Sequence, residues 1–380
     1  MPLHRVALIT DGIWPYVLGG MQKHSYYLCK YLASQKVEVH LFHFNQSNYD
    51  ISKLEFFSDE ERKYIHSNVL VFPKSLPFPG HYLYNSYRYS KCIYALIKDK
   101  ISSFDYIYTK GFSGWYLINA KHKNVVGFPK IGVKFHGYEM FQVPPDFKTK
   151  LQHILLLRKP VRSISTKADH VFSYGGKITD IILSIGINRS KIIELPSGVE
   201  ASVLVKEIKP TQKPLKFLFL GRYERRKGVQ ELNATLQNTN ESDFEFHFIG
   251  PIPEEYKIKL SQVVYHGEIR DKKQLNELIR SCDVLVCPSW SEGMPNVILE
   301  AMANGLSVIA TDVGATAVLV NEQNGWLLKS PAPAEIERSL QKVLHSSLLE
   351  IDRKKNNALL LIKERFTWEN LISELVKKIS

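Results

Sequence analysis

The stretch from residue 283 to residue 316 constrains the fold of this chain most, because its pattern alternates between strand and helix over a short length. Residues 283–287 form a mostly apolar run that ends at Pro288, as a buried parallel strand would. Pro295 suits the first turn of a helix, where its missing N–H is not needed. Residues 306–310 are the next apolar run, and between the two runs apolar side chains recur at helical spacing at Val297, Ile298, Ala301 and Met302. The stretch therefore predicts a strand, loop, helix and strand of an α/β fold with parallel strands.

Two carboxylates lie on either side of the predicted start of this helix. Glu292 is in the loop before the helix, and Glu300 lies one turn beyond Asn296 on the same face. A helix start offers free N–H groups, here those of residues 296–298, and the positive end of the helix dipole, so it favours phosphate. Carboxylates accept paired hydrogen bonds from vicinal hydroxyls. The combination predicts a sugar nucleotide, with one carboxylate on the transferred sugar and the other on the ribose.

The segment SEGMPNVILEAMANG, which contains Glu292 and Glu300, resembles the signature of retaining glycosyltransferase family 4, whose members have the GT-B fold. The resemblance implies two facing Rossmann-like, doubly wound domains with a cleft between them. It implies that Glu292 contacts hydroxyls of the donor sugar and that Glu300 contacts the ribose. The donor-binding residues that it implies in this segment are Gly293, Met294, Pro295, Asn296, Val297 and Glu300.

The beginning of the chain also predicts a doubly wound fold. Residues 5–10 predict a strand, residues 21–33 a helix and residues 37–42 the next strand, with Gly19 and Gly20 just before the helix. Taken alone, the paired glycines are more simply a tight turn. The resemblance implies that they face the donor diphosphate, where backbone N–H groups can approach a ligand without a side chain in the way. The pattern lacks G-x-G-x-x-G, so it does not predict a dinucleotide site.

Three further side chains follow predicted strands, at the end where open α/β sheets bind ligands. His136 follows the strand at 130–135, and the resemblance places it beside the reacting sugar, although a lone histidine is more often structural. Arg222 and Lys227 follow the strand at 215–220, in a Gly-Arg…Lys-Gly pattern that matches the family. Both cations can bind phosphate oxygens, and the alternative is a solvated basic loop. The predicted catalytic residues are His136, Arg222, Lys227 and Glu292.

No Asp-x-Asp occurs in the chain, although metal-dependent glycosyltransferases generally use such carboxylates to hold Mn²⁺ or Mg²⁺ on the diphosphate. We therefore expect a metal-independent enzyme without a metal site or cofactor, whose donor substrate is a nucleotide-diphosphate sugar. The leaving diphosphate would be neutralised by Arg222, Lys227, the amides near Gly19 and Gly20, and the helix start at Asn296. The resemblance implies front-face displacement with retention of the anomeric configuration.

A length of 380 residues indicates two domains of ordinary size. We expect an N-terminal Rossmann-like acceptor domain over 1–200, a polar, proline-containing linker over 201–214 and a C-terminal Rossmann-like nucleotide-sugar domain over 215–365. By resemblance, residues 366–380 form a helix that crosses back to the first domain. The chain departs from the family at residues 197–200, where Ser-Gly-Val-Glu replaces the usual Asn-Gly-Val-Asp, and this puts the side-chain role of the replaced residues in doubt.

The positive charge is uneven, because residues 1–200 hold 26 Lys and Arg against 15 Asp and Glu in a chain of net charge +12. Basic proteins bind nucleic acid, phosphates or anionic membranes. No helix-turn-helix, zinc-finger or RNA-recognition pattern is present, so nucleic acid is not predicted as a partner. The four cysteines lack disulfide density and metal spacing, no apolar run approaches the ~18 residues that span a bilayer, and no signal peptide is predicted. These features predict a cytoplasmic protein.

Residues 76–98 are rich in tyrosine, with lysine and arginine between the tyrosines. One interpretation is a helix whose tyrosines pack half-buried on the sheet. The other is an amphipathic surface that faces the headgroup layer of a membrane. The second fits a peripheral enzyme on the inner face of an anionic membrane, which extends a glycan or lipid-linked glycan acceptor in bacterial-type surface polysaccharide synthesis.

Two other functions fit a chain with this fold. A GT-B sugar-nucleotide epimerase also binds a diphosphate in the cleft, but it would use other carboxylates and would not need the loop from Glu292 to Glu300. A non-catalytic GT-B scaffold subunit would not need the five site residues that are all present, which are His136, Arg222, Lys227, Glu292 and Glu300. The sequence leaves open the donor sugar, its base (UDP, GDP or ADP), the acceptor, the linkage and the oligomeric state.

Overall fold

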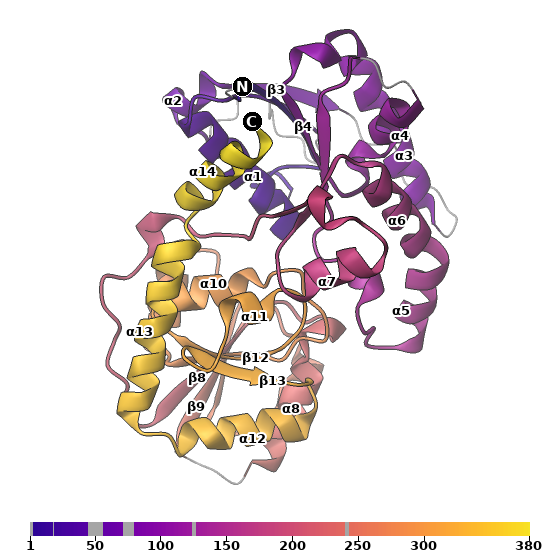
Figure 1. The fold of residues 1–380 in the computed structure, drawn as a ribbon. Coiled ribbons are helices and arrows are strands. Elements are labelled where there is room, and N and C mark those ends of the chain that lie inside the picture. Colours follow the sequence, from indigo (N-terminus) through magenta and orange to yellow (C-terminus); the bar gives the residue numbers. More distant parts are fainter. Residues whose placement is uncertain (1–2, 18, 45–55, 71–79, 124–126, 240–242) are drawn as a thin grey trace.

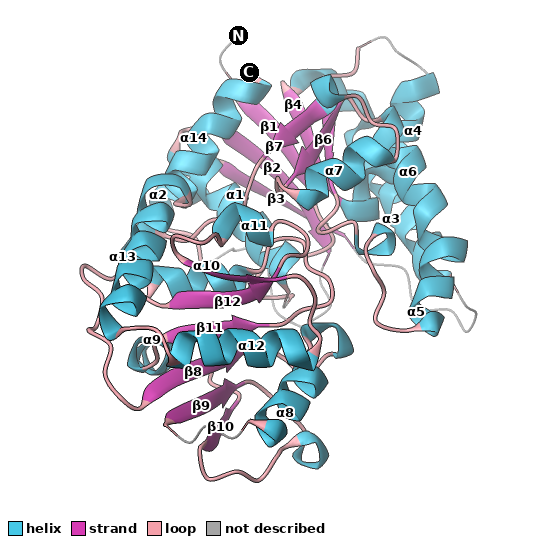
Figure 2. Ribbon diagram, turned by 60° about the horizontal axis from the view of Figure 1, so that its bottom comes forward, coloured by secondary structure: helices cyan, strands magenta, loops and turns pink. Residues whose placement is uncertain are grey.

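The computed structural model describes residues 3–17, 19–44, 56–70, 80–123, 127–239 and 243–380. These residues form two parallel β-sheets with helices packed on their faces, and the two α/β halves lie against each other (Figures 1 and 2). The predicted fold class, α/β with two Rossmann-like units, is confirmed.

The first sheet belongs to the N-terminal half. In spatial order it contains β3 (Ile65–Leu70), β2 (Glu38–Phe44), β1 (Arg5–Ile9), β4 (Tyr106–Lys110), β5 (Lys130–Lys134), β6 (His170–Ser173) and β7 (Ile192–Glu194), and all neighbours are parallel. Val6 and Leu8 of β1 belong to one hydrophobic core, and Ala7 and Ile9 belong to the other. Both faces of the sheet are therefore buried, as expected for a parallel sheet.

The second sheet has the same doubly wound character. In spatial order it contains β10 (Val263–Gly267), β9 (Phe244–Ile249), β8 (Leu215–Leu220), β11 (Val284–Cys287), β12 (Ser307–Thr311) and β13 (Gly325–Leu328), again all parallel. The strand order reverses between β8 and β11, as it does between β1 and β4 in the first sheet. Such switch points are where open α/β sheets bind ligands, at the carboxyl ends of the strands.

Helices follow most strands and cover the two sheets. Those of the first half are α1 (Gly20–Ser34), α2 (Asp59–Arg62), α3 (His81–Ile97), α4 (Trp115–Lys123), α5 (Phe147–Gln152), α6 (Arg158–Lys167) and α7 (Lys177–Ser184), and a π-helical turn (His153–Leu157) joins α5 to α6. Those of the second half are α8 (Val229–Asn238), α9 (Lys272–Ser281), α10 (Asn296–Ala303), α11 (Thr316–Leu319), α12 (Pro333–Leu344) and α13 (Leu348–Arg365).

The last helix, α14 (Trp368–Ile379), returns to the first half and packs against α1 (Figure 1). Trp368 is buried, and its ring stacks on the ring of Tyr27 with 5.2 Å between the centroids. Just before the helix, Thr367 forms an isolated parallel bridge with Val199. The core of the N-terminal half is thus completed by the C-terminal end of the chain.

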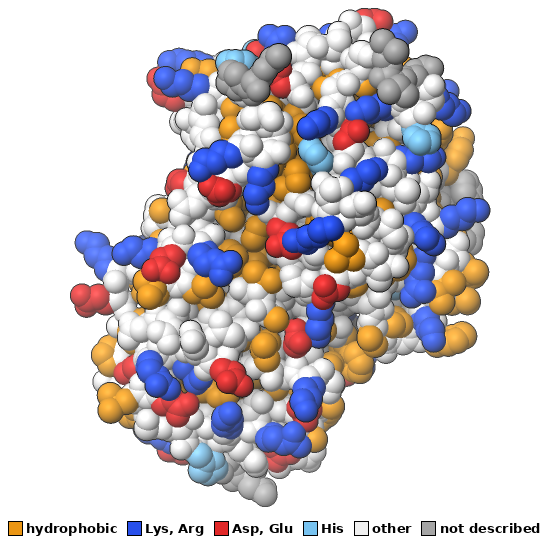
Figure 3. All heavy atoms as spheres, in the orientation of Figure 1, with side chains coloured by type: hydrophobic (Ala, Val, Ile, Leu, Met, Phe, Trp, Pro, Cys, Tyr) orange, Lys and Arg blue, Asp and Glu red, His pale blue; other side chains and the backbone are white. Residues whose placement is uncertain are grey.

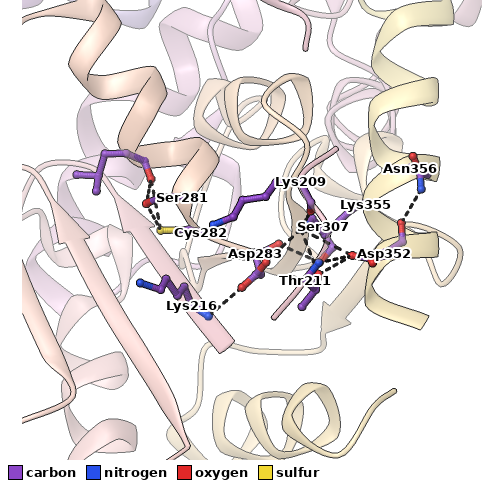
Figure 4. Close-up of polar contacts among 11 residues, drawn as sticks. Lys209, Thr211, Lys216, Ser281, Cys282, Asp283, Ser307, Asp352, Lys355 and Asn356 are labelled. Atoms are coloured by element: carbon purple, nitrogen blue, oxygen red, sulfur yellow. Dashed lines mark hydrogen bonds and ion pairs between the residues drawn. The ribbon is translucent and has the colours of Figure 1, made fainter. Parts of the chain in front are cut away.

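A buried ion pair joins α13 to the sheet of the second half (Figure 4). Lys355 is 1% exposed, and its Nζ lies 3.1 Å from Oδ1 of Asp283, the residue before β11. The same Nζ donates to the backbone oxygen of Lys209 at 2.7 Å and to the hydroxyl of Thr211 at 3.1 Å. With three partners the buried ammonium is satisfied, and the network ties the segment before β8 to α13.

Within the tyrosine-rich stretch at 76–98, residues 81–97 form α3, and residues 76–79 lie outside the described residues. Tyr89 is buried and donates to the backbone oxygen of Thr10, whereas Tyr82 is about half exposed. The helix therefore has one packed face and one exposed face. In the described part of the chain, no helix is long and apolar enough to cross a bilayer.

Candidate active site

Loops at the carboxyl ends of four strands meet between the two halves. Gly20 follows β1 and His136 follows β5, on the side of the first sheet. Lys227 follows β8 and Glu292 follows β11, on the side of the second sheet. The ligand-binding edges of the two sheets therefore face one another across a shared cleft.

Glycines allow the backbones of the two halves to touch at this point. A Cβ atom on Gly293 would lie 1.9 Å from the backbone oxygen of His136, which no side chain could tolerate. A Cβ atom on Gly20 would lie 3.1 Å from Nε2 of His136 and 3.6 Å from the side-chain nitrogen of Asn296. Gly19 precedes Gly20 as the N-cap of α1. The structure thus brings these predicted site residues together from three separate loops, those after β1, β5 and β11.

Glu292 is a buried charged group of the site, with 6% of its surface exposed. Its Oε1 accepts a hydrogen bond from Lys227 Nζ at 2.6 Å and from the hydroxyl of Ser289 at 2.8 Å, and Oε2 lies 3.4 Å from Arg226 Nη1. Burial alone would raise the pKa of this carboxyl group. The charges of Lys227 and Arg226 outweigh burial and hold the pKa of Glu292 below its ordinary value, so the carboxylate is ionised at neutral pH.

The structure separates the two basic residues that the sequence grouped together. Lys227 contacts Glu292, but Arg222 is 72% exposed at its side chain and pairs with Glu224 at 2.8 Å. The arginine that reaches Glu292 is Arg226, which sequence reasoning missed. The only sequence signal for Arg226 was its place next to Lys227 in a basic run, so the function of Arg222 stays a prediction.

Glu300 forms an ion pair that spans the cleft. Its Oε1 lies 2.5 Å from Nζ of Lys23, which is on α1 one turn after Gly20. The negative charge of Glu300 raises the pKa of Lys23, so the lysine is charged. Lys23 was not predicted as a site residue, because nothing within α1 indicates that its partner lies in the other half of the chain.

The start of α10 differs in detail from the expectation. The helix begins at Asn296, and Pro295 is its N-cap rather than part of its first turn. Because the N–H of Ile298 donates to the backbone oxygen of Pro295 at 3.0 Å, the prediction that three amides are free for a phosphate was wrong. The amides of Asn296 and Val297 donate to no described residue, so two remain for a ligand.

Met294 lies between the predicted donor-binding residues but is directed into the protein. It is buried, and its sulfur accepts a hydrogen bond from the backbone N–H of Ser197 at 3.1 Å. This contact holds the loop before α10 against the segment that follows β7. Met294 therefore contacts the N-terminal half of the chain through Ser197.

His136 is held in position by Tyr174, whose hydroxyl lies 2.8 Å from Nδ1. Burial, together with the nearby charges of Lys110, Lys134 and Arg226, lowers the pKa of His136 well below its ordinary value. The imidazole is therefore neutral at pH 7. Since Nδ1 is engaged by Tyr174, Nε2 is the nitrogen that faces Gly20 and the start of α10.

Two buried lysines lie behind His136, on either side of His24. Nζ of Lys110 is 2.7 Å from Nδ1 of His24, and Nζ of Lys134 is 3.1 Å from Nε2. A neutral imidazole has one acceptor nitrogen, so at most one of the two lysines can be an ammonium that donates to it. Burial lowers the pKa of Lys110 to about 7 and that of His24 well below its ordinary value. The cluster therefore carries much less charge than its composition indicates.

A cavity of about 170 Å³ opens between the two halves beside these residues. It lies between α1, α9 and α10, and part of its wall comes from the loop after β7 and from Trp368. The polar and charged residues in its lining are Lys23, His24, Tyr27, Ser197, Glu200, Lys272, Asn276, Asn296, Glu300 and Asn304.

Among the described residues, one group of side chains has the composition and spacing of a metal site. It consists of Glu38, His40 and His66 on β2 and β3, whose ligand atoms all lie within 4.8 Å of one another. None of the three lines the cavity between the halves. Glu38 is also paired with Arg5 at 2.9 Å, which supplies a positive charge at the same place.

Family comparisons match both halves of the chain. Residues 18–203 match the family described as Glycosyltransferase Family 4, and residues 214–346 match the family described as Glycosyl transferases group 1. An uncharacterized glycosyltransferase of Methanocaldococcus jannaschii is 23% identical over 97% of both chains. The N,N'-diacetylbacillosaminyl-diphospho-undecaprenol alpha-1,3-N-acetylgalactosaminyltransferase of Campylobacter jejuni is 26% identical over 47% of this chain and 48% of its own.

Solved enzyme structures resemble this chain over almost its whole length. Sucrose-phosphate synthase from Thermosynechococcus elongatus has a TM-score of 0.77 at 18% identity, over 99% of this chain and 98% of that one. The lipopolysaccharide outer core galactosyltransferase WaaB has a TM-score of 0.73 at 19% identity, over 99% of both chains. At such identities the likeness establishes the fold, which is the GT-B fold expected from the sequence.

Proposed function

The chain belongs to the family 4 and group 1 glycosyltransferases of the GT-B fold, and from this membership we propose that it transfers a sugar from a nucleotide-diphosphate sugar to a glycan or lipid-linked glycan. We further propose that the transfer proceeds without a metal ion and with retention of the anomeric configuration. The acceptor would enter on the side of the N-terminal half.

The arrangement around Glu292 carries this proposal. Burial of the Glu292 carboxylate beside Lys227 and Arg226 lowers the stability of the fold, because these charges lose their hydration. Such an arrangement is useful where a ligand presents hydroxyls and phosphates close together. The carboxylate can accept hydrogen bonds from two hydroxyls of the donor sugar. The two cations can turn toward the diphosphate when it binds, because both already lie at the carboxyl end of β8.

The remaining charge on the diphosphate would be met by backbone groups. The amides of Asn296 and Val297 at the start of α10 and the loop at Gly19 and Gly20 approach the same region from opposite halves. Donors that are fixed before the reaction stabilise the charge that develops on a leaving group, and the loss of one typically costs ~2.7–4 kcal/mol. In this proposal the departing phosphate accepts the proton of the acceptor hydroxyl on the face where the sugar was attached.

The proposed role of His136 is to hold the donor sugar. Its neutral ring is fixed by Tyr174 through Nδ1, so Nε2 can donate to a sugar hydroxyl or to the ring oxygen. A charged imidazolium there would oppose the positive charge that develops at the anomeric carbon. The lowered pKa of His136 therefore suits the reaction.

The proposed acceptor class is supported by the names of relatives. The Campylobacter relative is named for a sugar linked to diphospho-undecaprenol, and the WaaB neighbour for the lipopolysaccharide outer core. For this chain we propose an acceptor of the same general class and work at the inner surface of a membrane, within surface polysaccharide synthesis.

The test is the release of nucleoside diphosphate from a panel of UDP-, GDP- and ADP-sugars, first without acceptor. Slow release of nucleoside diphosphate from one donor, unchanged in EDTA, is the expected result. Loss of that release with EDTA and its return with Mn²⁺ would overturn the metal-free part of the proposal.

The same panel distinguishes the two other functions considered from sequence. Isomerisation of the sugar without release of nucleoside diphosphate would identify an epimerase instead. Absence of both reactions and of any donor-induced rise in thermal unfolding temperature would identify a scaffold subunit. A ligand at 100 times its Kd stabilises a protein by ~2.7 kcal/mol, so binding of a true donor would be visible in that measurement.

A further inference from the structure

Exposed apolar side chains are concentrated on one short segment of the N-terminal half. Of the fifteen large hydrophobic residues that are exposed in the described chain, five lie between residues 143 and 155. Phe147 is the most exposed of the five at 77%. An apolar patch of this kind is unusual on a protein that has no partner there. The five residues, which we call the apolar row, are Val143, Phe147, Leu151, Ile154 and Leu155.

Basic side chains flank the apolar row on the same helices. Residues 143–167 contain six Lys and Arg and a single acidic residue, Asp146, whose carboxylate caps the start of α5. Figure 3 shows hydrophobic and basic side chains together along the right-hand edge of the molecule, over α5 and α6. The side chains of Arg158 and Lys167 donate hydrogen bonds to Met140 and Asn119, whereas those of Lys148, Lys150, Lys159 and Arg162 form no hydrogen bond or ion pair with a described residue.

A groove lies next to the apolar row, on the side of α6. It has a volume of about 720 Å³, and its lining combines apolar and basic side chains. The apolar part comes from Phe141, Ile154 and Ile185, and the basic part includes Arg158, Lys159, Arg162 and Lys167. Such a lining suits a phosphate with an attached hydrocarbon, because the charge and the apolar chain can be met side by side.

The segment is joined directly to the candidate active site. Gln142 precedes the apolar row by one residue, and its side-chain amide donates to the backbone oxygens of Gly137 and Glu292, both at 2.7 Å. Arg158 donates to the backbone oxygen of Met140 at 2.8 Å, which fixes the start of α6 to the same loop. The apolar row therefore lies beside the cleft, on the half that we assign to the acceptor.

We propose that the surface formed by α5, the π-helical turn and α6 docks on an anionic lipid bilayer, with the apolar row inserted between headgroups and the flanking basic residues on the phosphates. Apolar side chains bordered by Lys and Arg are the pattern of helices that lie in a membrane interface. A second copy of this chain is a poor partner, because two surfaces with this excess of positive charge repel each other.

The inference rests on the proposed function and makes it more specific. A lipid-linked acceptor would be presented from the bilayer to the cleft at Gly137 and Glu292, only a few residues from the inserted row. The proposed docking surface also differs from the surface expected from sequence, which was the tyrosine-rich helix α3. Arg88, Lys91 and Lys98 on and after α3 therefore provide a matched control within the same half.

The test is co-sedimentation of the full chain with vesicles of equal parts phosphatidylglycerol and phosphatidylcholine, compared with vesicles of phosphatidylcholine alone. Each basic side chain near such a surface contributes roughly fivefold to binding. The variant with Lys148, Lys150, Lys159 and Arg162 all changed to Gln is thus expected to bind at least ~100-fold more weakly. The variant Phe147→Ser, Leu151→Ser, Leu155→Ser is expected to lose binding to a similar degree, and the variant Arg88→Gln, Lys91→Gln, Lys98→Gln to lose little.

Release of nucleoside diphosphate without acceptor is measured in parallel, because these variants lie outside the donor site and are expected to keep it. Wild-type protein that stays in the supernatant at low salt, or that binds both kinds of vesicle equally, would overturn the inference. So would loss of binding in the α3 variant alone, or sedimentation equilibrium showing that the apolar row mediates self-association. Donor turnover without vesicle binding would leave the proposed function standing, and vesicle binding without turnover of any donor would count against the function instead.

Discussion

Replacement of Lys227 by Met tests the proposed site directly, because it removes one charge and keeps most of the side-chain volume. In the wild-type protein, Lys227 Nζ lies 2.6 Å from Oε1 of Glu292. The variant leaves Glu292 with the Ser289 hydroxyl at 2.8 Å and with Arg226 at 3.4 Å. A hydrogen bond to a charged group contributes ~1.5–3 kcal/mol. Since two partners remain, we expect a loss of about 2 kcal/mol in the free energy of unfolding at neutral pH rather than the ~3–5 kcal/mol of a fully broken buried pair.

The pH dependence of this loss has a definite sign. The pKa of Glu292 is below its ordinary value in the folded protein, so its ion pairing stabilises the fold above the pKa of the unfolded chain. That stabilisation disappears as the pH falls through the lowered pKa. In Lys227→Met the buried carboxyl group has a higher pKa and is protonated more easily. The difference in stability between wild type and variant should therefore be largest near neutral pH and should shrink toward pH 4 and below.

Turnover should fall much more than stability. If Lys227 meets the diphosphate in the transition state, its loss should reduce nucleoside-diphosphate release by ~10²–10³-fold. Arg225→Met is the matched control, because Arg225 is two residues away and pairs with Glu231 at 2.7 Å instead of with Glu292. We expect the control to lose stability and to keep turnover. Near wild-type turnover in Lys227→Met, or an equal loss in Arg225→Met, would refute the placement of the diphosphate at this loop.

Two further predictions concern the ligand and the fold. Glu292→Gln should weaken binding of the sugar nucleotide but not of the free nucleoside diphosphate, because only the first ligand carries the sugar. Glu300→Gln should weaken binding of both, because both carry the ribose. Calorimetry with the two ligands checks this, and equal losses in both variants for the diphosphate would mean that the roles are misassigned. Lys355→Met should lower the free energy of unfolding by ~3–5 kcal/mol, because Asp283 would remain buried without its charge partner. The double variant Lys355→Met, Asp283→Asn should recover part of that loss in chemical denaturation, and no recovery would show that the pair is not coupled.

Most of the fold could be predicted because its signals are local. The apolar runs at 283–287 and 306–310 and the helical spacing after Pro295 each predict one element, and the structure has β11, β12 and α10 there, with strand bounds that differ by one residue. Gly20 and Gly293 lie where the two halves touch, and the approach of a diphosphate to Gly19 and Gly20 stays a prediction. The apolar runs and the helical spacing involve only residues that are close in sequence, so they can be read from the sequence alone.

The parts that could not be predicted depend on how the two halves meet. Lys23 and Glu300 are on different helices of different halves, and neither helix indicates the pairing. The choice of Arg226 over Arg222 depends on the turn after β8, which directs one arginine toward Glu292 and the other toward solvent. A pattern of charges within a loop does not fix which side chain points inward.

The contacts of α14 help to explain how the two halves are held in position relative to each other. Trp368 packs on Tyr27 and edge-on against His24, and both of these residues are on α1. The same helix carries Gly20 and Lys23 into the cleft, where they meet His136 and Glu300. The C-terminal end of the chain therefore packs on the helix that contributes the N-terminal side of the donor site. Because α14 directly follows α13, which packs against α10, movement between the halves must be accommodated at the short connection around Thr367 as well as at the segment between β7 and β8. The site is thus assembled by a chain that crosses the cleft twice, once after β7 and once before α14.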